Sequence, residues 1–126
     1  MAEQSVTIDL DAAPEAAWAV LGDFFGLGEW FPGVESCRAQ GDVRVLEMLG
    51  MEVREQLIAR DDHARSLTYS IISGVPLERH RATVSVTSKE QGSQVEWAVE
   101  VEPDSMLPVL AGAYEKALRA LRERLF

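Results

Sequence analysis

The sequence has 126 residues, of which 47% are hydrophobic, so it can form one domain with one sizeable core. It carries 12 basic and 21 acidic residues, and at a formal net charge of -9 a nucleic-acid backbone or an anionic membrane surface would repel it. We therefore expect a single domain over residues 1–126, with neither nucleic acid nor membrane as a partner.

Cysteine and histidine are too scarce to predict a metal centre. Cys37 is the one cysteine, and His63 and His80 are the two histidines, so neither a disulfide nor a metal site is expected. The sequence shows no glycine-rich phosphate loop and no nucleophile elbow, and we expect no cofactor. The lone thiol and the lack of a leader-like N-terminal pattern favour a reducing, cytoplasmic location.

The first thirty residues predict one strand and two short helices. Apolar residues alternate over Val6 to Leu10, which is the pattern of a strand with one buried face. A proline then opens a helical pattern from Pro14 to Leu21. Glycines and prolines follow, so the segment Asp23 to Trp30 can hold at most one more short helix before a turn.

The middle of the chain alternates between strand and turn patterns. It predicts an antiparallel meander with the strands Val43 to Leu49, Val53 to Ala59, Ser66 to Ile72, Ala82 to Thr87 and Val95 to Val101. One face of these strands is apolar and the other carries serine, threonine, glutamate and arginine. The apolar face therefore needs another element to cover it.

The last twenty residues predict that cover. After Pro103 the apolar residues recur at helical spacing, at Leu107, Leu110, Ala111, Tyr114, Leu118, Leu121 and Leu125. The expected fold is α+β: a curved antiparallel sheet of about seven strands wrapped around a long C-terminal helix, with two short helices after the first strand. Such a sheet cannot close-pack on one helix everywhere, so we expect an internal cavity between them.

A spaced set of residues carries a family resemblance over nearly the whole chain. It comprises Val6 and Ile8, Ala13-Pro14, Trp18, Val20-Leu21, Asp23-Phe24, Trp30, Pro32, Val34, Gly41, Val43-Arg44, Glu55, Leu57, Asp61-Asp62, Tyr69, Ile71 and Trp97. In these positions the chain resembles the START-like SRPBCC superfamily, and within it the polyketide cyclase/dehydrase-like branch. The resemblance implies a helix-grip fold around a cavity for a hydrophobic ligand, in a superfamily that includes lipid carriers, receptors, cyclases and dehydratases.

Arg44 and Glu55 are the first candidate site. If their hairpin turns at Gly50, the two residues lie nearly opposite on adjacent strands and both point to the apolar face. A buried arginine and carboxylate must then pair. The pair can be purely structural, or Arg44 can hold a ligand oxygen through its planar fork while Glu55 orients the ligand or acts as a base.

His80, Tyr69 and Tyr114 are the second candidate site. Histidine transfers protons near neutral pH, and tyrosine hydroxyls can polarise a carbonyl or hold an enolate. The alternation places His80 on the face of Ala82, although its position between Arg79 and Arg81 is also typical of a surface histidine. We predict Arg44, Glu55, His80 and Tyr69 as candidate catalytic residues, and His63 as a surface residue.

Aromatic and long apolar side chains are the candidate ligand contacts. Trp30, Phe31 and Met51 lie in turn-like segments and are predicted at the rim of the cavity. The predicted ligand-binding residues are Trp30, Phe31, Met48, Leu57, Ile71, Trp97, Leu110 and Tyr114. Segments 30–33 and 74–77 are candidates for a lid.

Three functions are compatible with the sequence. The first is binding of a hydrophobic, polyketide-like, aromatic or lipid molecule with cofactor-free cyclisation or dehydration. The second is a non-catalytic carrier or sensor of such a ligand, and the third is a homo-oligomeric structural protein with a collapsed cavity. The sequence leaves open whether the protein is a monomer or a homodimer.

Overall fold

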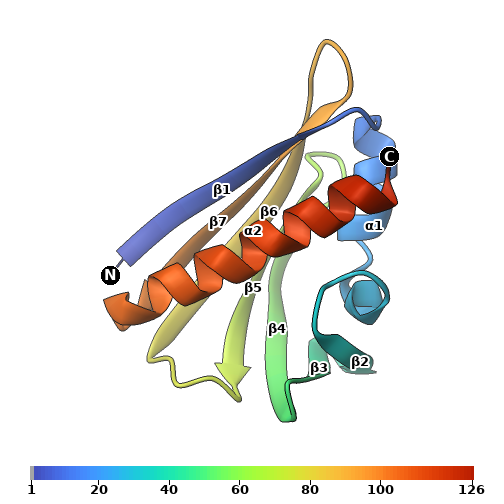
Figure 1. The fold of residues 1–126 in the computed structure, drawn as a ribbon. Coiled ribbons are helices and arrows are strands. Elements are labelled where there is room, and N and C mark those ends of the chain that lie inside the picture. The colour runs from blue at the N-terminus through green and yellow to red at the C-terminus, as the bar shows by residue number, and fades with distance from the viewer. Residues whose placement is uncertain (1) are drawn as a thin grey trace.

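The computed structural model describes residues 2–126 and contains one seven-stranded antiparallel sheet, shown in Figure 1. Its strands are β1 (Ala2–Leu10), β2 (Val34–Gln40), β3 (Val43–Met48), β4 (Met51–Asp61), β5 (Ser66–Ser73), β6 (Arg79–Ser88) and β7 (Ser93–Glu102). The helices are α1 (Pro14–Leu21), the 3-10 turns η1 (Phe24–Glu29) and η2 (Asp104–Met106), and α2 (Leu107–Arg124).

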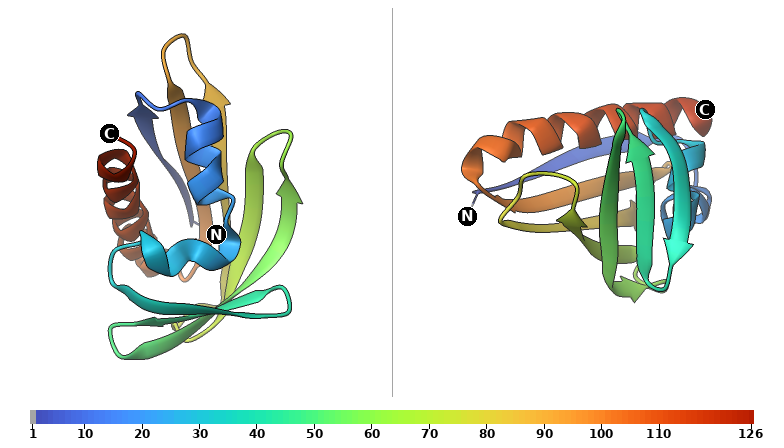
Figure 2. Two further views of the ribbon diagram at one scale, coloured as in Figure 1. Left: turned by 90° about the vertical axis from the view of Figure 1, so that its right-hand side faces the viewer. Right: turned by 90° about the horizontal axis from the view of Figure 1, so that it is seen from below.

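The strand order is β1-β7-β6-β5-β4-β3-β2. Strands β2 to β7 form a meander in which consecutive strands pair, and β1 pairs with β7 at the far edge. The sheet curves strongly, so that β2 and β3 lie across the direction of β1 and β7 (Figure 2). The concave face of this curve holds the core and the cavity.

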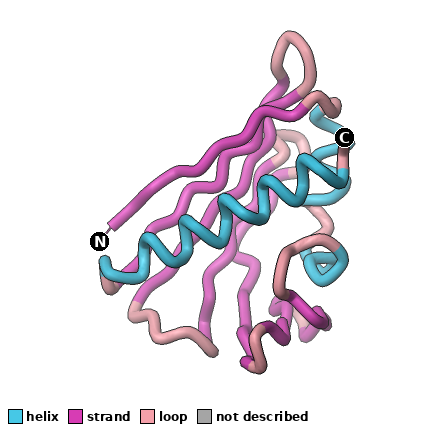
Figure 3. Tube along the Cα trace, in the orientation of Figure 1, coloured by secondary structure: helices cyan, strands magenta, loops and turns pink. Residues whose placement is uncertain are grey.

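Helix α2 covers the concave face and packs against β1 and β7 (Figure 3). Its buried residues are Leu110, Ala111, Tyr114, Ala117, Leu118 and Leu121, which follow the predicted helical spacing. Strand β7, which packs against α2, alternates regularly, and its buried apolar residues are Val95, Trp97, Val99 and Val101. Proline stands in the first turn of both α1 and α2, where its missing N–H costs no helical hydrogen bond.

The short helices close one end of the curved sheet. Helix α1 packs against β6 and β7, and η1 packs against β2 and β3. Through η1, the main chain at Phe24 reaches the side chain of Arg44 on β3, where the carbonyl oxygen accepts a 3.0 Å hydrogen bond from Nη1. The 3-10 turn η1 therefore helps to position the polar end of the cavity.

The predicted helix-grip fold with a sheet of about seven strands is confirmed, but the sequence pattern does not locate β2. Strand β2 is an edge strand with the burial pattern of a mostly exposed segment, and a bulge between Val34 and Ser36 breaks its alternation. An edge strand of this kind gives no period-2 signal. Five of the other strands extend beyond the predicted bounds by one to four residues at one or both ends, and β3 ends one residue before its predicted end, at Met48.

No helix in the described part of the chain combines the length and the apolar character that crossing a membrane requires.

Candidate ligand-binding site

A cavity of about 210 Å³ lies between the inner face of β3, β4 and β5 and the N-terminal half of α2. It is lined by Leu27, Phe31, Arg44, Leu46, Met48, Leu49, Met51, Val53, Glu55, Tyr69, Ile71, Val75, Met106, Val109, Leu110, Ala113 and Tyr114. Arg44, Glu55 and the two tyrosines bear its ionisable side chains, and the other lining residues are apolar. This is the chemistry of a pocket for an apolar molecule with one polar end.

The β3–β4 hairpin forms one wall, and its turn lies at the mouth of the cavity. Leu49 and Gly50 both have positive φ, at 53° and 75°, as a two-residue hairpin turn of the type I′ class requires. Glycine adopts this conformation without cost, whereas leucine is strained there. Leu49 is also 78% exposed, so an apolar side chain on a strained backbone projects to solvent at the cavity's edge.

The opposite wall comes from α2 and from the loop after β5. Met106, Val109, Leu110 and Ala113 line the cavity at helical spacing. Val75 enters from the loop because Gly74, with φ of 96°, lies so close to β4 that a Cβ there would collide with the carbonyl oxygen of Glu52. Of the two predicted lid segments, Phe31 and Val75 are the residues that face the cavity.

Arg44 and Glu55 form a buried ion pair at the inner end of the cavity. They are direct cross-strand partners, and Nε of Arg44 donates a 2.7 Å hydrogen bond to Oε1 of Glu55. The guanidinium lies between two aromatic rings, with Cζ 4.0 Å from the Phe24 centroid and 4.7 Å from that of Tyr69. The predicted pairing and its inward orientation are thus confirmed, and the positive charge is stabilised by a carboxylate and two ring faces.

A second polar network connects the cavity to the sheet. Tyr69 Oη accepts a 3.1 Å hydrogen bond from Nε1 of Trp97, and the hydroxyl of Tyr114 also hydrogen-bonds it. Nε2 of His80 lies 3.0 Å from Oη of Tyr114. The ring of Tyr114 stacks on Trp97 with centroids 4.4 Å apart.

His80 lies at the point where β5 and β6 separate. The pairing of these strands ends at Tyr69 and Ala82, and beyond this point the backbone N–H of Ile71 donates to Nδ1 of His80 over 3.0 Å. The imidazole therefore replaces a lost strand partner for Ile71. His80 is 6% exposed, which excludes the surface interpretation, whereas His63 is exposed as predicted.

Burial shifts the pKa values of this network away from the charged forms. Desolvation lowers the pKa of His80 to about 4, so the ring is neutral at pH 7. Desolvation also raises the pKa of Tyr69 and of Tyr114 well above the usual tyrosine value, and the negative charge of Glu55 acts in the same direction. Both hydroxyls therefore remain protonated and act as neutral hydrogen-bonding groups.

Eight of the twelve predicted site residues line this cavity: Arg44, Glu55, Tyr69, Phe31, Met48, Ile71, Leu110 and Tyr114. Met51 also lines it and is 46% exposed, in agreement with its predicted place at the rim. The structure therefore brings together side chains that are up to 83 positions apart in the sequence, from Phe31 to Tyr114.

Four predicted residues do not line the cavity. Trp97 lies behind Tyr114, and His80 lies behind both tyrosines. Leu57 packs into the main core next to a bulge at Leu57 and Ala59, which ends the inward alternation of β4. Trp30 packs against Phe31 and Trp97, with ring centroids 5.8 and 6.4 Å away.

The lining residues absent from the prediction are Leu27, Leu46, Leu49, Val53, Met106, Val109 and Ala113, whereas Val75 belongs to the predicted lid segment 74–77. Leu46 and Val53 share the alternation of Arg44 and Glu55, so the same pattern indicates them. Met106, Leu110 and Ala113 similarly share one helical face. Leu49 and Val75 sit in turns, and only the folded chain brings them to the cavity.

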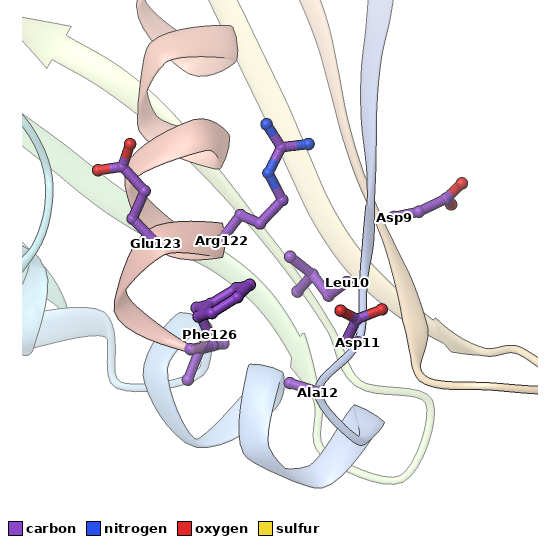
Figure 4. A pocket seen from close by; sticks show the side chains of 8 residues that line it. Asp9, Leu10, Asp11, Ala12, Arg122, Glu123 and Phe126 are labelled. Atoms are coloured by element: carbon purple, nitrogen blue, oxygen red, sulfur yellow. The ribbon is translucent and has the colours of Figure 1, made fainter.

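A second cleft, of about 400 Å³, lies where the end of α2 meets the end of β1 (Figure 4). It is larger, but its lining is mostly charged or exposed: Asp9, Asp11, Arg122, Glu123 and Phe126 accompany Leu10, Ala12 and Leu125. Phe126 is fully exposed beside it. No buried polar group points to a ligand there, so the smaller internal cavity is the better candidate site.

The comparisons with known proteins agree with this geometry. The family model described as polyketide cyclase/dehydrase and lipid transport matches residues 1–125. The structure of protein XoxI from Bacillus cereus is 27% identical, with a TM-score of 0.94 over 99% of this chain and 96% of that one. A putative uncharacterised protein from Bacillus thuringiensis is 25% identical, with a TM-score of 0.91 over 98% of both chains.

A more distant structure supports the fold alone. A START superfamily protein from Mycobacterium smegmatis is 20% identical, with a TM-score of 0.73 over 98% of this chain and 96% of that one. No curated protein sequence matches this chain. From the family match along almost its whole length, the chain belongs to the polyketide cyclase/dehydrase and lipid transport family, with the helix-grip fold of START-like proteins.

Proposed function

We propose that this protein binds a small hydrophobic molecule with one polar end in the cavity between the β3–β4 hairpin and α2. The observation that carries this proposal is the buried Arg44–Glu55 pair at the inner end of an otherwise apolar cavity. An apolar body would lie along Leu46, Met48 and Leu110, and its polar end would reach the guanidinium and the Tyr69 hydroxyl.

The size of the cavity limits the ligand. At about 210 Å³ it is smaller than the roughly 300–1,000 Å³ of typical ligand pockets. The occupant is therefore a compact aromatic or short-chain molecule, unless the segments around Phe31 and Val75 move outward to admit a longer lipid. The large apolar side chains at the mouth, Leu49 and Val109, are 78% and 59% exposed and lie where such a ligand would enter.

The geometry favours a binding protein over an enzyme. Both ring nitrogens of His80 are engaged, by Ile71 and Tyr114, and the ring does not reach the cavity. The group that can serve as a base is Glu55, since of the lining residues it alone carries a carboxylate. Cofactor-free cyclisation or dehydration with Glu55 as base and Arg44 holding an enolate is therefore the second candidate function.

The test is native mass spectrometry of the protein as purified from its own host, followed by organic extraction. A bound molecule of one discrete mass, released by extraction and lost in a variant with a filled cavity, supports the proposal. Conversion of the extracted molecule by the wild type but not by Glu55→Gln would establish the enzymatic alternative. An apo mass, together with no uptake of any small apolar probe, would favour the collapsed-cavity structural role.

The remaining parts of the proposal concern the cellular location and the oligomeric state. We place the protein in the cytoplasm, on the basis of its single half-buried thiol, Cys37, and treat it as a monomer or homodimer. Size-exclusion chromatography with light scattering measures the second point directly.

A further inference from the structure

In the hydrogen-bond chain that leads from His80 through Tyr114 to Tyr69, the tautomer of His80 decides which group of each pair donates. Because Nδ1 of His80 accepts the N–H of Ile71, this nitrogen carries no proton. A neutral imidazole must then hold its proton on Nε2, which faces Oη of Tyr114 at 3.0 Å. His80 is therefore the donor in its bond with Tyr114.

The same donor order holds for the next hydrogen bond, from Tyr114 to Tyr69 at the cavity. With its oxygen accepting from His80, the Tyr114 hydroxyl donates its own proton to Tyr69. Nε1 of Trp97, which can only donate, bonds the same Tyr69 oxygen at 3.1 Å. A hydroxyl has two acceptor sites and one proton, so both acceptor sites of Tyr69 are used and its proton remains free to donate. Tyr69 lines the cavity, where this free proton can be donated to a ligand.

The neighbouring charges select against a second anion. Arg44 offers further N–H donors at the same end of the cavity, since its described hydrogen bonds use Nε and Nη1. Its positive charge is already balanced by Glu55 at 2.7 Å. An ionised carboxylate on the ligand would add an uncompensated buried negative charge beside Glu55, which costs several kcal/mol. A neutral oxygen acceptor meets the two donors without this cost.

We infer that the site selects neutral ligands with a carbonyl-type acceptor oxygen over ionised acids, and that His80 is a positioning residue that makes Tyr69 a donor toward the ligand. This inference rests on the proposed function, because it concerns the polar end of the same cavity. His80 does not touch the ligand. It acts through Tyr114.

Three probes of matched length and shape test the selectivity: 2-nonanone, octanoate and 2-methyl-1-nonene, which differ at one end in carrying a neutral acceptor, an anion or no acceptor. Dissociation constants are measured at pH 7 by chemical-shift titration of the labelled protein. The ketone should bind about threefold to tenfold more tightly than the alkene, as one net hydrogen bond provides. Octanoate should bind more weakly than both.

Variants at Tyr69 and His80 separate positioning from packing. In Tyr69→Phe the preference for the ketone over the alkene should disappear. His80→Leu should weaken the same preference, and His80→Gln should restore it, because glutamine can accept from Ile71 and donate to Tyr114. The 13C shift of a carbonyl-labelled 2-nonanone reports the bond itself and should move upfield in Tyr69→Phe and His80→Leu, but not in His80→Gln.

The possible failures are distinct. If none of the three probes binds, the proposed function itself is wrong. If they bind but octanoate matches the ketone, or if Tyr69→Phe leaves the ketone preference and the 13C shift unchanged, the cavity stands and the inferred selectivity is overturned. If His80→Leu weakens all three probes equally, His80 has a packing role and is not a positioning residue.

Discussion

Arg44 and Glu55 are direct partners across β3 and β4, and the 2.7 Å bond from Nε to Oε1 lies at side chains that are only 3% and 8% exposed. For a pair as buried as this, replacing one partner and replacing both have unequal effects on the stability of the fold. Losing one partner leaves the other charge buried and unmatched, whereas replacing both by apolar residues removes the desolvation cost together with the attraction.

The first prediction concerns this asymmetry. Glu55→Gln should lower the free energy of unfolding by about 3–5 kcal/mol, because it leaves Arg44 without its counter-charge. The double variant Arg44→Met with Glu55→Leu should recover most of this loss. Urea unfolding at pH 7 measures both.

An exposed ion pair on the same sheet provides the control. Arg38 and Glu52 lie 3.0 Å apart with side chains 56% and 46% exposed. Glu52→Gln should therefore cost less than about 1 kcal/mol. Equal losses in Glu55→Gln and Glu52→Gln would show that the inner pair contributes no more than a surface one.

The second prediction is a pH dependence of stability due to His80. Its pKa is lowered from 6.5 to about 4 by burial, so between these values the unfolded state binds more protons than the folded one. Stability should therefore fall as the pH falls from 6.5 toward 4. Since one pKa unit corresponds to about 1.4 kcal/mol, the loss that is due to His80 should approach roughly 3 kcal/mol.

The comparison of variants isolates this contribution from that of the carboxylates. His80→Gln should unfold with a flatter pH profile over the same range, whereas His63→Gln, at an exposed turn, should keep the wild-type profile. Unfolding free energies from urea titrations at several pH values give both curves. Parallel curves for the wild type and His80→Gln would refute the assignment.

The third prediction concerns the strained leucine at the cavity mouth. Leu49→Asn should raise the free energy of unfolding by about 1 kcal/mol, because asparagine tolerates the positive φ of 53° better than leucine. It should also weaken 2-nonanone binding by a few-fold, through loss of apolar contact at the rim. Leu49→Ala should weaken binding without adding stability, and a gain of affinity in either variant would contradict a ligand-contacting role.

The fourth prediction fills the cavity from the helix. Ala113→Phe places a large ring in the space lined by Met48, Ile71 and Leu110, and should abolish probe binding while changing stability by less than about 2 kcal/mol. Lys116→Phe adds the same ring on the exposed side of α2 and should bind probes as the wild type does. Undiminished binding in Ala113→Phe, measured by native mass spectrometry, would place the ligand elsewhere.

The amount of structure that the sequence predicts differs from element to element. The regular periodicities of β7 and α2 predict these elements and their inward faces, because each buries one continuous stripe. The same reasoning predicts the Arg44–Glu55 pair, since the turn at Gly50 fixes the register. Strand β2 is not predicted in this way because most of its residues are exposed at the sheet edge and show no alternation.

The parts of the site that escape prediction depend on tertiary structure. The alternation places His80 on the face of Ala82, but the flanking Arg79 and Arg81 leave its burial open, because its partners are the backbone of Ile71 and the hydroxyl of Tyr114 on α2. Likewise, the sequence predicts Val75 only as part of the lid segment 74–77, and its contact with the cavity depends on Gly74 lying directly on β4. These positions follow from the opening of the sheet between β5 and β6, which no periodicity records.

The methionine methyl groups show most directly whether the cavity holds the ligand, because Met48, Met51 and Met106 all line it and Met1 is the only other methionine. Protein labelled with 13C at the methionine methyls is saturated with 2-nonanone, and intermolecular nuclear Overhauser effects are recorded, with assignment by single Met→Leu variants. If the ligand occupies the cavity, the ketone should show contacts to all three cavity methionines. Binding without contacts to any of them, or with shifts confined to the cleft at Leu10 and Phe126, would contradict binding in the cavity.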